Sequence, residues 1–342
     1  MTIKKLLIAN RGEVAVRIAR AAADLDIATV AIYPADDERA LQAGVADQAV
    51  ALSGQGVAAY LDGEQLVRVA REQGCDAVHP GYGFLSESRD FAARCADAGL
   101  IFVGPDADTL ALLGDKARAR VLAEECQVPV VPGTGADTTL DQARAFRDGL
   151  GDGATVIVKA IAGGGGRGMR IVRPGDDLAE AFKRCQAEAG AAFGNDAVYV
   201  ERFIERARHI EVQVLGDGGE TPVHLWEREC SLQRRNQKLV EVAPSPTLSE
   251  DTRQQLLDAA LRLAAKVGYR SLGTFEFLVD ADESRFAFIE ANPRLQVEHT
   301  VTEEITGVDL VQAQLRVAGG ASLADLGLTR PPQPLGFAMQ LR

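Results

Sequence analysis

Short, uninterrupted apolar runs alternate with segments of helical spacing in the N-terminal part of the chain. A brief apolar run bounded by turn residues is typical of a buried strand, and apolar residues three or four positions apart are typical of an amphipathic helix. Strands alternating with helices imply a parallel, doubly wound sheet. The predicted strands are at 5–9, 28–33, 77–79 and 101–103, and the predicted helices at 11–24, 64–73 and 91–98.

A Pro/Gly segment, VPVVPGTGA, follows a predicted helix at 115–126 and indicates a domain boundary. Beyond it, a helix at 140–149 precedes two apolar strands, at 155–160 and 169–173. The pattern therefore predicts a second unit beyond the boundary, with a further apolar strand at 198–204.

Four consecutive glycines, Gly163 to Gly166, connect the predicted strands at 155–160 and 169–173. The loop lacks the GK[ST] of a P-loop. Its backbone N–H groups can still close over phosphates, with Lys159 supplying positive charge. The alternative is an inert hairpin tip, and the cations Lys159 and Arg167 on either side of the loop favour phosphate binding.

Two aromatic-rich runs, at 273–280 and 285–292, predict a β-hairpin around the turn at 281–284. If the hairpin is symmetric about Glu283, Glu276 lies opposite Glu290, and alternation puts Asn292 on the face of Glu290. Opposed carboxylates about 5 Å apart repel by roughly 3 kcal/mol at an effective dielectric of about 20. A hard cation removes this repulsion, and two carboxylates with an amide oxygen suit Mg²⁺ or Mn²⁺. The alternative is a solvated edge hairpin, against which the aromatic residues argue.

Charged and amide residues follow the hairpin directly, after Pro293. Arg294 and Glu298 suit a small anion that is held by the arginine and deprotonated by the carboxylate. A structural ion pair explains the same two residues equally well.

Three further segments carry candidate chemistry. Glu201, near the middle of an apolar strand, is typical of the hinge beside a nucleobase. The alternating strand at 209–215 favours ligand contact for His209 over an ordinary strand histidine, and it is predicted to pair through the turn at 216–219 with a strand at 223–226. The basic run at 233–238 lies between two apolar strands, although such runs are usually solvated. The loop at 79–87, HPGYGFLSE, follows a strand where open α/β sheets bind ligands, but chemistry alone does not distinguish it from a glycine-rich connection.

Composition narrows the class of protein. The 342 residues suit two or three domains, and 46% hydrophobic with 25% charged residues is ordinary for a globular chain. The net charge of −12, without a Lys/Arg-rich run, argues against nucleic-acid binding. No apolar run approaches the roughly 20 residues that cross a membrane. The five dispersed cysteines, without CxxC, predict reduced thiols in a cytoplasmic protein.

Six motifs in one order resemble the biotin carboxylase family within the ATP-grasp superfamily. The motifs are IANRGEVAVRI, HPGYGFLSE, KAIAGGGGRGM, RHIEVQV, RECSLQRRNQK and FIEANPRLQVEH. The resemblance covers the whole chain and implies an α/β ATP-grasp fold. It implies an N-terminal doubly wound parallel-sheet domain at 1–113, a linker helix at 114–130, a small glycine-loop lid at 131–203 and a larger mixed-sheet catalytic domain at 204–342.

The resemblance also implies the roles of individual residues. The expected ATP contacts are Lys116, Lys159, Gly165, Gly166, Met169, Glu201, Arg202, Phe203, Ile204, His209, Gln233, Asn236, Glu276 and Glu290. The expected metal ligands are Glu276, Glu290 and Asn292, in agreement with the hairpin argument. The expected bicarbonate pocket contains Lys238, Arg294, Gln296, Val297 and Glu298. Glu298 is the expected base, with Arg294, Lys238 and Arg342 as further catalytic residues, and Tyr82 and Arg342 are expected beside biotin.

The implied reaction is ATP-dependent carboxylation of biotin on a biotin carboxyl carrier protein or domain, through carboxyphosphate. ATP, Mg²⁺ or Mn²⁺, and carrier-bound biotin are the implied cofactors. The implied partners are the carrier, a carboxyltransferase component and a second copy of the chain, with no nucleic acid and no membrane. Another ATP-grasp carboxylate ligase and a nucleotide-binding fragment without turnover are the alternatives.

The chain departs from the family pattern at two places. Asn236 stands where the family commonly has histidine, which weakens the expected nucleotide contact there. The chain ends at Arg342 within a predicted strand, so we expect the last domain to be incomplete.

Overall fold

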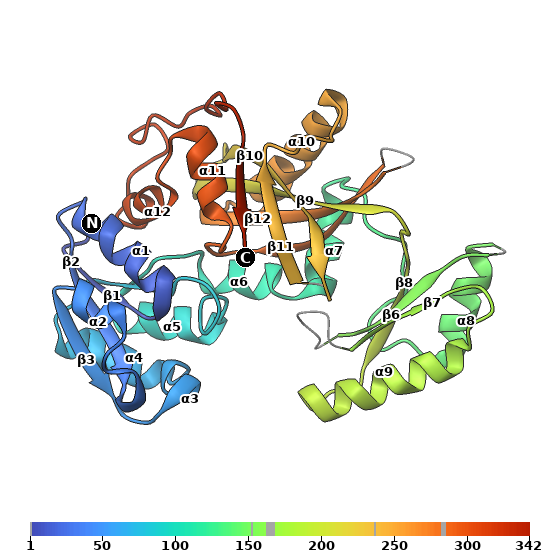
Figure 1. Ribbon diagram of the computed structural model, residues 1–342, viewed down its shortest axis with the longest axis horizontal. Helices are drawn as coiled ribbons and strands as arrows, with labels where there is room; N and C mark the ends of the chain where they lie inside the picture. The colour runs from blue at the N-terminus through green and yellow to red at the C-terminus, as the bar shows by residue number, and fades with distance from the viewer. Residues whose placement is uncertain (1, 152, 162–167, 236, 282–284) are drawn as a thin grey trace.

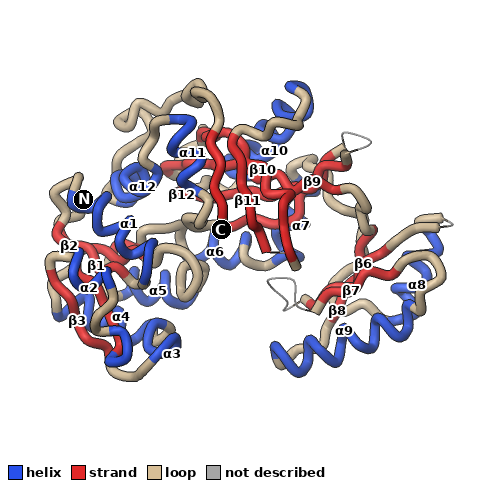
Figure 2. The backbone as a smooth tube through the Cα atoms, in the orientation of Figure 1, coloured by secondary structure: helices blue, strands red, loops and turns tan. Residues whose placement is uncertain are grey.

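The computed structural model describes residues 2–151, 153–161, 168–235, 237–281 and 285–342. Within these ranges the chain forms three β-sheets with helices packed against them (Figure 1). The tube view shows helices α6 (Ala107–Leu113) and α7 (Lys116–Glu125) between the N-terminal sheet and the other two sheets (Figure 2). None of the helices in the described ranges has the length and apolar character needed to span a membrane.

The N-terminal sheet is parallel and has helices on both faces, as predicted. Alternation along the first strand explains this arrangement, because Leu6 and Ile8 join one hydrophobic core while Leu7 joins another. The strands, in the order β3-β2-β1-β4-β5, are β1 (Lys5–Ile8), β2 (Ala28–Pro34), β3 (Gln48–Leu52), β4 (Ala77–His79) and β5 (Ile101–Phe102). The helices are α1 (Gly12–Ala23), the 3₁₀ helix η1 (Ala35–Asp37), α2 (Leu41–Val45), α3 (Gly56–Tyr60), α4 (Gly63–Glu72), α5 (Arg89–Asp97) and α6 (Ala107–Leu113).

A smaller unit with its own core lies to one side of the other two sheets (green in Figure 1). Its antiparallel sheet has the order β7-β6-β8 and packs against two helices. The chain reaches this unit after helix α7 (Lys116–Glu125). Its elements are α8 (Leu140–Gly149), β6 (Val156–Ala160), β7 (Met169–Val172), α9 (Leu178–Phe193) and β8 (Val198–Arg202). The last strand is shorter than predicted, so Phe203 and Ile204 follow it.

The largest sheet has the order β13-β12-β9-β10-β11-β14, with antiparallel pairing between the named strands. An isolated parallel bridge between Val130 and Phe288 lies at its β13 edge. The strands are β9 (Ala207–Asp217), β10 (Val223–Arg234), β11 (Gln237–Ala243), β12 (Arg270–Asp280), β13 (Phe286–Asn292) and β14 (Ala338–Leu341). The helices of this region are α10 (Glu250–Lys266), α11 (His299–Thr306) and α12 (Leu310–Ala318).

The hairpin of β12 and β13 has the predicted register only near its open end. Thr274 is opposite Asn292, and Glu276 is opposite Glu290. The register then shifts by one residue, so Phe277 is opposite Phe288 and the prediction of a symmetric hairpin is wrong beyond this bulge. A bulge bends the strand and redirects side chains, and here it lies beside the carboxylates of interest.

Strand β10 extends well past the apolar run at 223–226 that predicted it. The run is followed by the buried charged residues Glu227, Arg228 and Glu229, which conceal the strand from a hydrophobic pattern. The described residues of the basic run at 233–238 belong to β10 and β11, and Gln233 is opposite Lys238.

Candidate active site

A cavity of about 1000 Å³ lies where the smaller unit, the β12–β13 hairpin and strand β14 approach one another. It is lined by every candidate residue within the described ranges. These residues are Tyr82, Lys116, Lys159, Met169, Glu201, Arg202, Phe203, Ile204, His209, Gln233, Lys238, Glu276, Glu290, Asn292, Arg294, Gln296, Val297, Glu298 and Arg342. Gly165, Gly166 and Asn236 lie outside the described residues. The structure brings the other candidates together, and their individual roles stay predictions.

Lys238 is a cation in the cavity wall that three carboxylates share. Its Nζ lies 2.5 Å from Glu211 Oε2, 3.1 Å from Glu276 Oε1 and 2.8 Å from Glu298 Oε1. Burial lowers the pKa of Lys238, but the three carboxylates more than offset burial and raise it above its ordinary value. The ammonium group is therefore charged and shared by residues from three separate segments.

Glu298 is an ionised carboxylate between two cations. Arg342 Nη2 lies 2.6 Å from Glu298 Oε2, on the side away from the oxygen that Lys238 contacts. Burial raises the pKa of Glu298, whereas Lys238 first and Arg228 next lower it, with a net result of about 2. Arg294, which was predicted to act with this carboxylate on one anion, contacts Glu87 and Asn292 instead.

Arg294 instead joins the hairpin to the loop at 79–87. Its Nε donates to Glu87 Oε1 at 2.5 Å, and its Nη2 donates to Asn292 Oδ1 at 2.9 Å. In the same loop, the Tyr82 hydroxyl donates to Glu13 of α1. The loop at 79–87 is therefore part of the cavity wall rather than a remote connection.

The two opposed hairpin carboxylates have separate cationic partners. Glu276 is 3% exposed and accepts from Asn292 Nδ2 at 2.8 Å and Gln296 Nε2 at 3.2 Å, in addition to Lys238. Glu290 Oε2 lies 3.1 Å from Lys116 Nζ. The predicted repulsion is thus relieved by side chains in this structure. The donor set of two carboxylates and an amide still fits a hard divalent cation.

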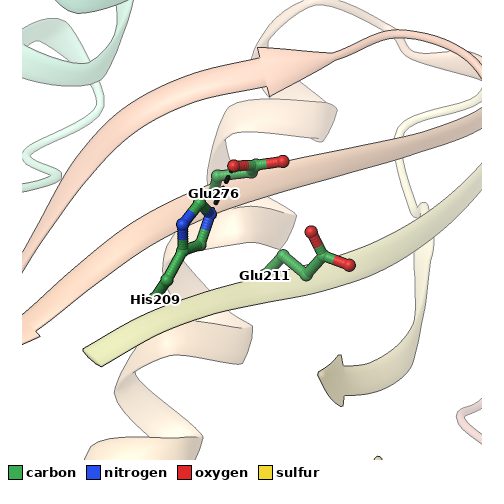
Figure 3. Close-up of side chains that lie close together, drawn as sticks. All are labelled: His209, Glu211 and Glu276. Atoms are coloured by element: carbon green, nitrogen blue, oxygen red, sulfur yellow. Dashed lines mark hydrogen bonds and ion pairs between the residues drawn. The ribbon is translucent and has the colours of Figure 1, made fainter. Parts of the chain in front are cut away.

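His209, Glu211 and Glu276 form a compact group whose ligand atoms lie within 4.8 Å of one another. Figure 3 shows the His209 ring directed at the Glu276 carboxylate, with Glu211 beside it on the same strand as the histidine. Burial lowers the pKa of His209, but Glu276 raises it further, so the net direction is upward. Because Lys238 Nζ contacts both carboxylates, we interpret the group as an ion-pair network rather than a metal centre.

On the side of the smaller unit, Lys159 of β6 and Glu201 of β8 face the cavity. Lys159 Nζ lies 2.5 Å from Glu201 Oε2, and Arg120 Nη1 of α7 lies 3.3 Å from Glu201 Oε1. Met169 is opposite Lys159 in the sheet, which places it at the mouth of the glycine loop. These contacts connect α7 to the sheet of the smaller unit through one carboxylate.

Three buried charged residues beside the cavity were not among the predicted site residues. Glu211, Arg228 and Glu241 each have no exposed side-chain surface, and Arg342 Nε lies 2.8 Å from Glu241 Oε1. The available signal was a charged residue at an inward position of a strand, because such a position is normally apolar.

Comparisons with known proteins agree with this geometry. Residues 2–110 match the family described as biotin carboxylase, N-terminal domain, and residues 115–326 match carbamoyl-phosphate synthase L chain, ATP binding domain. Pyruvate carboxylase of Aspergillus terreus is 51% identical over 100% of this chain, and the human mitochondrial pyruvate carboxylase is 52% identical over 99%. The chain spans 29% of the length of each of these two relatives.

Two solved structures share the fold across almost the whole chain. The biotin carboxylase domain dimer of Hydrogenobacter thermophilus 2-oxoglutarate carboxylase, in complex with MgADP, ADP and bicarbonate, has a TM-score of 0.93 at 42% identity, covering 100% of this chain and 75% of that one. A biotin carboxylase complex from Campylobacter jejuni has a TM-score of 0.93 at 39% identity, covering 99% and 75%. The predicted ATP-grasp fold is confirmed, and the chain belongs to the biotin carboxylase family.

Proposed function

We propose that this chain carries out the ATP- and bicarbonate-dependent carboxylation of biotin on a biotin carboxyl carrier protein or domain. The observation that carries the proposal is the position of Glu298 between Lys238 and Arg342, in one cavity with the candidate nucleotide contacts. A buried, ionised carboxylate flanked by cations can accept a proton from a small anion bound beside it. A related domain bound to MgADP and bicarbonate supports the same assignment.

Nucleotide binding falls to the residues on both sides of the cavity. Lys116 and Lys159 supply positive charge for the phosphates, while the segment at 201–204 and His209 lie where the base and ribose would bind. Glu276, Glu290 and Asn292 are the residues that would hold Mg²⁺ or Mn²⁺. A divalent cation bound there would neutralise charge on the phosphate oxygens.

Bicarbonate is proposed to bind against Lys238, Arg294, Gln296 and Val297. Glu298 takes the bicarbonate proton, and a bicarbonate oxygen then forms a bond to the γ-phosphorus as the bond to the ADP oxygen breaks. The products of this step are ADP and carboxyphosphate. The lysines stabilise the charge that develops on the transferred group.

Carboxyphosphate then breaks into CO₂ and phosphate inside the cavity. The phosphate removes the proton from biotin N1′, and the resulting nucleophile attacks CO₂ to form the N–C bond. Arg342 and Tyr82 are proposed to hold the biotin ring. Arg342 would balance the negative charge of the enolate, because its guanidinium is a cation that lines the cavity.

The domain roles follow from the same proposal. Residues 131–203 would act as a lid that excludes water from carboxyphosphate, with 1–113, 114–130 and 204–342 as N-terminal domain, linker and catalytic domain. A carrier, a carboxyltransferase component and a second copy of the chain are the proposed partners. The five free thiols fit a reducing, cytoplasmic location.

The test is ADP release from MgATP with bicarbonate and biotin, beside the transfer of labelled carboxyl to biotin. We expect both to depend on bicarbonate and to disappear when it is omitted. If ADP release does not depend on biotin but increases with another nucleophile, the chain is a different ATP-grasp ligase. Nucleotide binding without any bicarbonate-dependent ADP release would refute the proposal.

A further inference from the structure

We propose that Arg228 is a positioning residue that holds the bicarbonate pocket in its binding geometry. The inference rests on the proposed function, because it concerns the pocket formed by Lys238, Gln296 and Glu298. Arg228 lies on β10, behind the pocket, and its side chain is fully buried. It does not line the cavity, so it acts through the residues that do.

Every N–H group of the Arg228 guanidinium has an acceptor. A guanidinium has five such groups in a rigid planar fork, so its partners must lie in fixed directions. The acceptors come from β9, β12, α11 and the segment after β13. They are Glu211 Oε1 at 2.5 Å from Nε, Gln213 Oε1 at 2.8 Å and Thr302 Oγ1 at 2.9 Å from Nη1, and Thr274 Oγ1 at 3.3 Å and Gln296 Oε1 at 2.9 Å from Nη2.

Two of these acceptors reach the pocket with their other end. Gln296 accepts from Arg228 through Oε1 and donates from Nε2 to Glu276 at 3.2 Å. Glu211 accepts from Arg228 through Oε1 and from Lys238 through Oε2, at 2.5 Å each. Arg228 therefore determines the orientation of the Gln296 amide and the strength of the ion pair between Glu211 and Lys238.

Charge balance gives Arg228 a second effect on Lys238. Without the guanidinium, Glu211 would keep Lys238 as its remaining ion-pair partner, although its carboxylate has no exposed surface. A buried carboxylate that has lost one of its two cations is unfavourable, so Glu211 would hold Lys238 more strongly and leave it less available to Glu298 and the anion. The same loss would leave the Gln296 amide free to rotate.

Stability alone does not account for a fully buried arginine at this position. Removing a guanidinium from water is costly, and well-packed apolar residues of similar volume often stabilise a core as much as a buried ion pair does. A core side chain whose five donors all face fixed acceptors instead restricts the orientation of those acceptors. One of the restricted side chains, Gln296, lines the cavity, and another, Glu211, holds Lys238, which also lines it. This is why we assign Arg228 to positioning.

The Arg228→Lys variant of the 342-residue chain tests the proposal, because it keeps the charge but cannot reach five acceptors. Calorimetry would measure the Kd of bicarbonate at saturating MgADP and, separately, the Kd of MgADP. We expect the bicarbonate Kd to rise about tenfold or more, with the MgADP Kd within about twofold of the wild type. A purely structural role would lower the thermal midpoint and the binding stoichiometry but leave both constants of the folded fraction unchanged.

Two isosteric threonine variants form a matched pair that does not depend on the folding of Arg228→Lys. Thr274→Val removes an acceptor from Nη2, the nitrogen that also holds Gln296, and we expect the bicarbonate Kd to rise about threefold. Thr302→Val removes an acceptor from Nη1, whose other partner is Gln213, and the bicarbonate Kd should be unchanged. Equal effects of the two threonine variants, or none, would overturn the proposal.

The binding readout also separates this inference from the proposed function. A wild-type chain that binds bicarbonate but releases no ADP would defeat the proposed function, while the variants still decide whether Arg228 positions the pocket. A wild-type chain that binds no bicarbonate beside MgADP would overturn the inference itself.

Discussion

Glu298 is the residue on which the cations of the cavity converge. With a pKa of about 2, its carboxylate is ionised at any ordinary pH, but it is then a weak proton acceptor. Binding of an anion beside it changes this balance, because a nearby negative charge raises the pKa of a carboxylate. Bicarbonate would also compete for Lys238. The substrate thus makes Glu298 more basic when a base is needed.

Replacing Glu298 by glutamine keeps the size and hydrogen bonding of the side chain but removes its proton affinity. We expect bicarbonate-dependent ADP release from the Glu298→Gln variant to fall by about 10²-fold or more, which is the usual contribution of a positioned base. ATP affinity, measured by calorimetry, should survive. If turnover is retained, or if ATP affinity is lost together with turnover, Glu298 is not the base.

Glu290 offers a test of the proposed metal ligands. Glu290→Gln should weaken binding of Mg²⁺·ATP strongly, because it removes one of two carboxylates from the donor set. Metal-free ATP should bind at least as well as before, since the substitution frees Lys116, which lies 3.1 Å from Glu290. Calorimetry with and without Mg²⁺ checks this, with the exposed Glu220→Gln as a control. Equal weakening of both nucleotide forms would show that Glu290 serves structure.

For individual residues, the sequence predicted which side chains line the cavity but not which of them form ion pairs. The motifs identified the side chains that line the cavity, including Lys238, Arg294 and Glu298. Pairing depends on strand register and on side-chain direction, which residue types do not reveal. Arg294 therefore contacts Glu87 instead of Glu298, and the fully buried Arg228 went unnoticed.

Helix α7 presents Lys116 in its first turn, and the cap of that helix determines the position of the lysine. Asp115 accepts from the backbone N–H groups of Ala117 and Arg118, at 2.9 and 3.1 Å. Asp115→Ala removes both bonds, which costs about 1 kcal/mol of stability and lets the first turn fray. We expect ATP affinity to fall about fivefold, the equivalent of that free energy.

The matched control is Asp62→Ala at the start of α4, where Asp62 accepts from Gln65 N at 3.0 Å. Helix α4 belongs to the N-terminal sheet, and none of its residues lines the cavity. The control should lose comparable stability in urea unfolding while ATP affinity stays within about twofold. If both variants lose ATP affinity to the same extent, the effect is global rather than local to Lys116.

Elements with regular periodicity were predictable, and elements with buried charge were not. The helix at 140–149 has the predicted bounds, because its capping box and spacing are both visible in the sequence. Strand β10 was predicted only for its first residues, since Glu227, Arg228 and Glu229 interrupt the apolar pattern. The bulge that places Phe277 opposite Phe288 leaves no signal in the period-two sequence pattern.

At the scale of the whole molecule, the N-terminal sheet and the C-terminal helix α12 share one core. Residues of β1, α1 and α12 belong to a single hydrophobic cluster, although they are far apart in the chain. The smaller unit has a separate cluster, which fits the proposed movement of residues 131–203 as a lid. The shared core explains why the loop at 79–87 can form a fixed wall of the cavity.

Three of the four histidines are buried in these cores as neutral groups. Burial lowers the pKa of His79 to about 3 and the pKa values of His224 and His299 to about 4. An unfolded histidine titrates near pH 6.5, so below that pH the unfolded chain binds protons that the folded chain does not. The contribution of these histidines to the free energy of unfolding is therefore fully present above pH 6.5. It declines as the pH falls toward their pKa values in the folded chain. The pKa of His209 is raised in the folded chain, so its contribution to the free energy of unfolding is lost only as the pH rises.

We accordingly expect the free energy of unfolding to decrease between pH 6 and 5 by up to about 4 kcal/mol, since each neutral histidine contributes about 1.4 kcal/mol per pH unit. His224 provides the cleanest variant, because its ring packs edge-on against Trp226 and does not line the cavity. His224→Gln keeps an acceptor for the Trp226 backbone N–H and should reduce the decrease by about a third. Urea unfolding of both proteins at pH 7, 6 and 5 provides the comparison. A wild-type stability that stays level across this range, or a His224→Gln variant that follows the wild-type curve in parallel, would show that these histidines do not control the acid response.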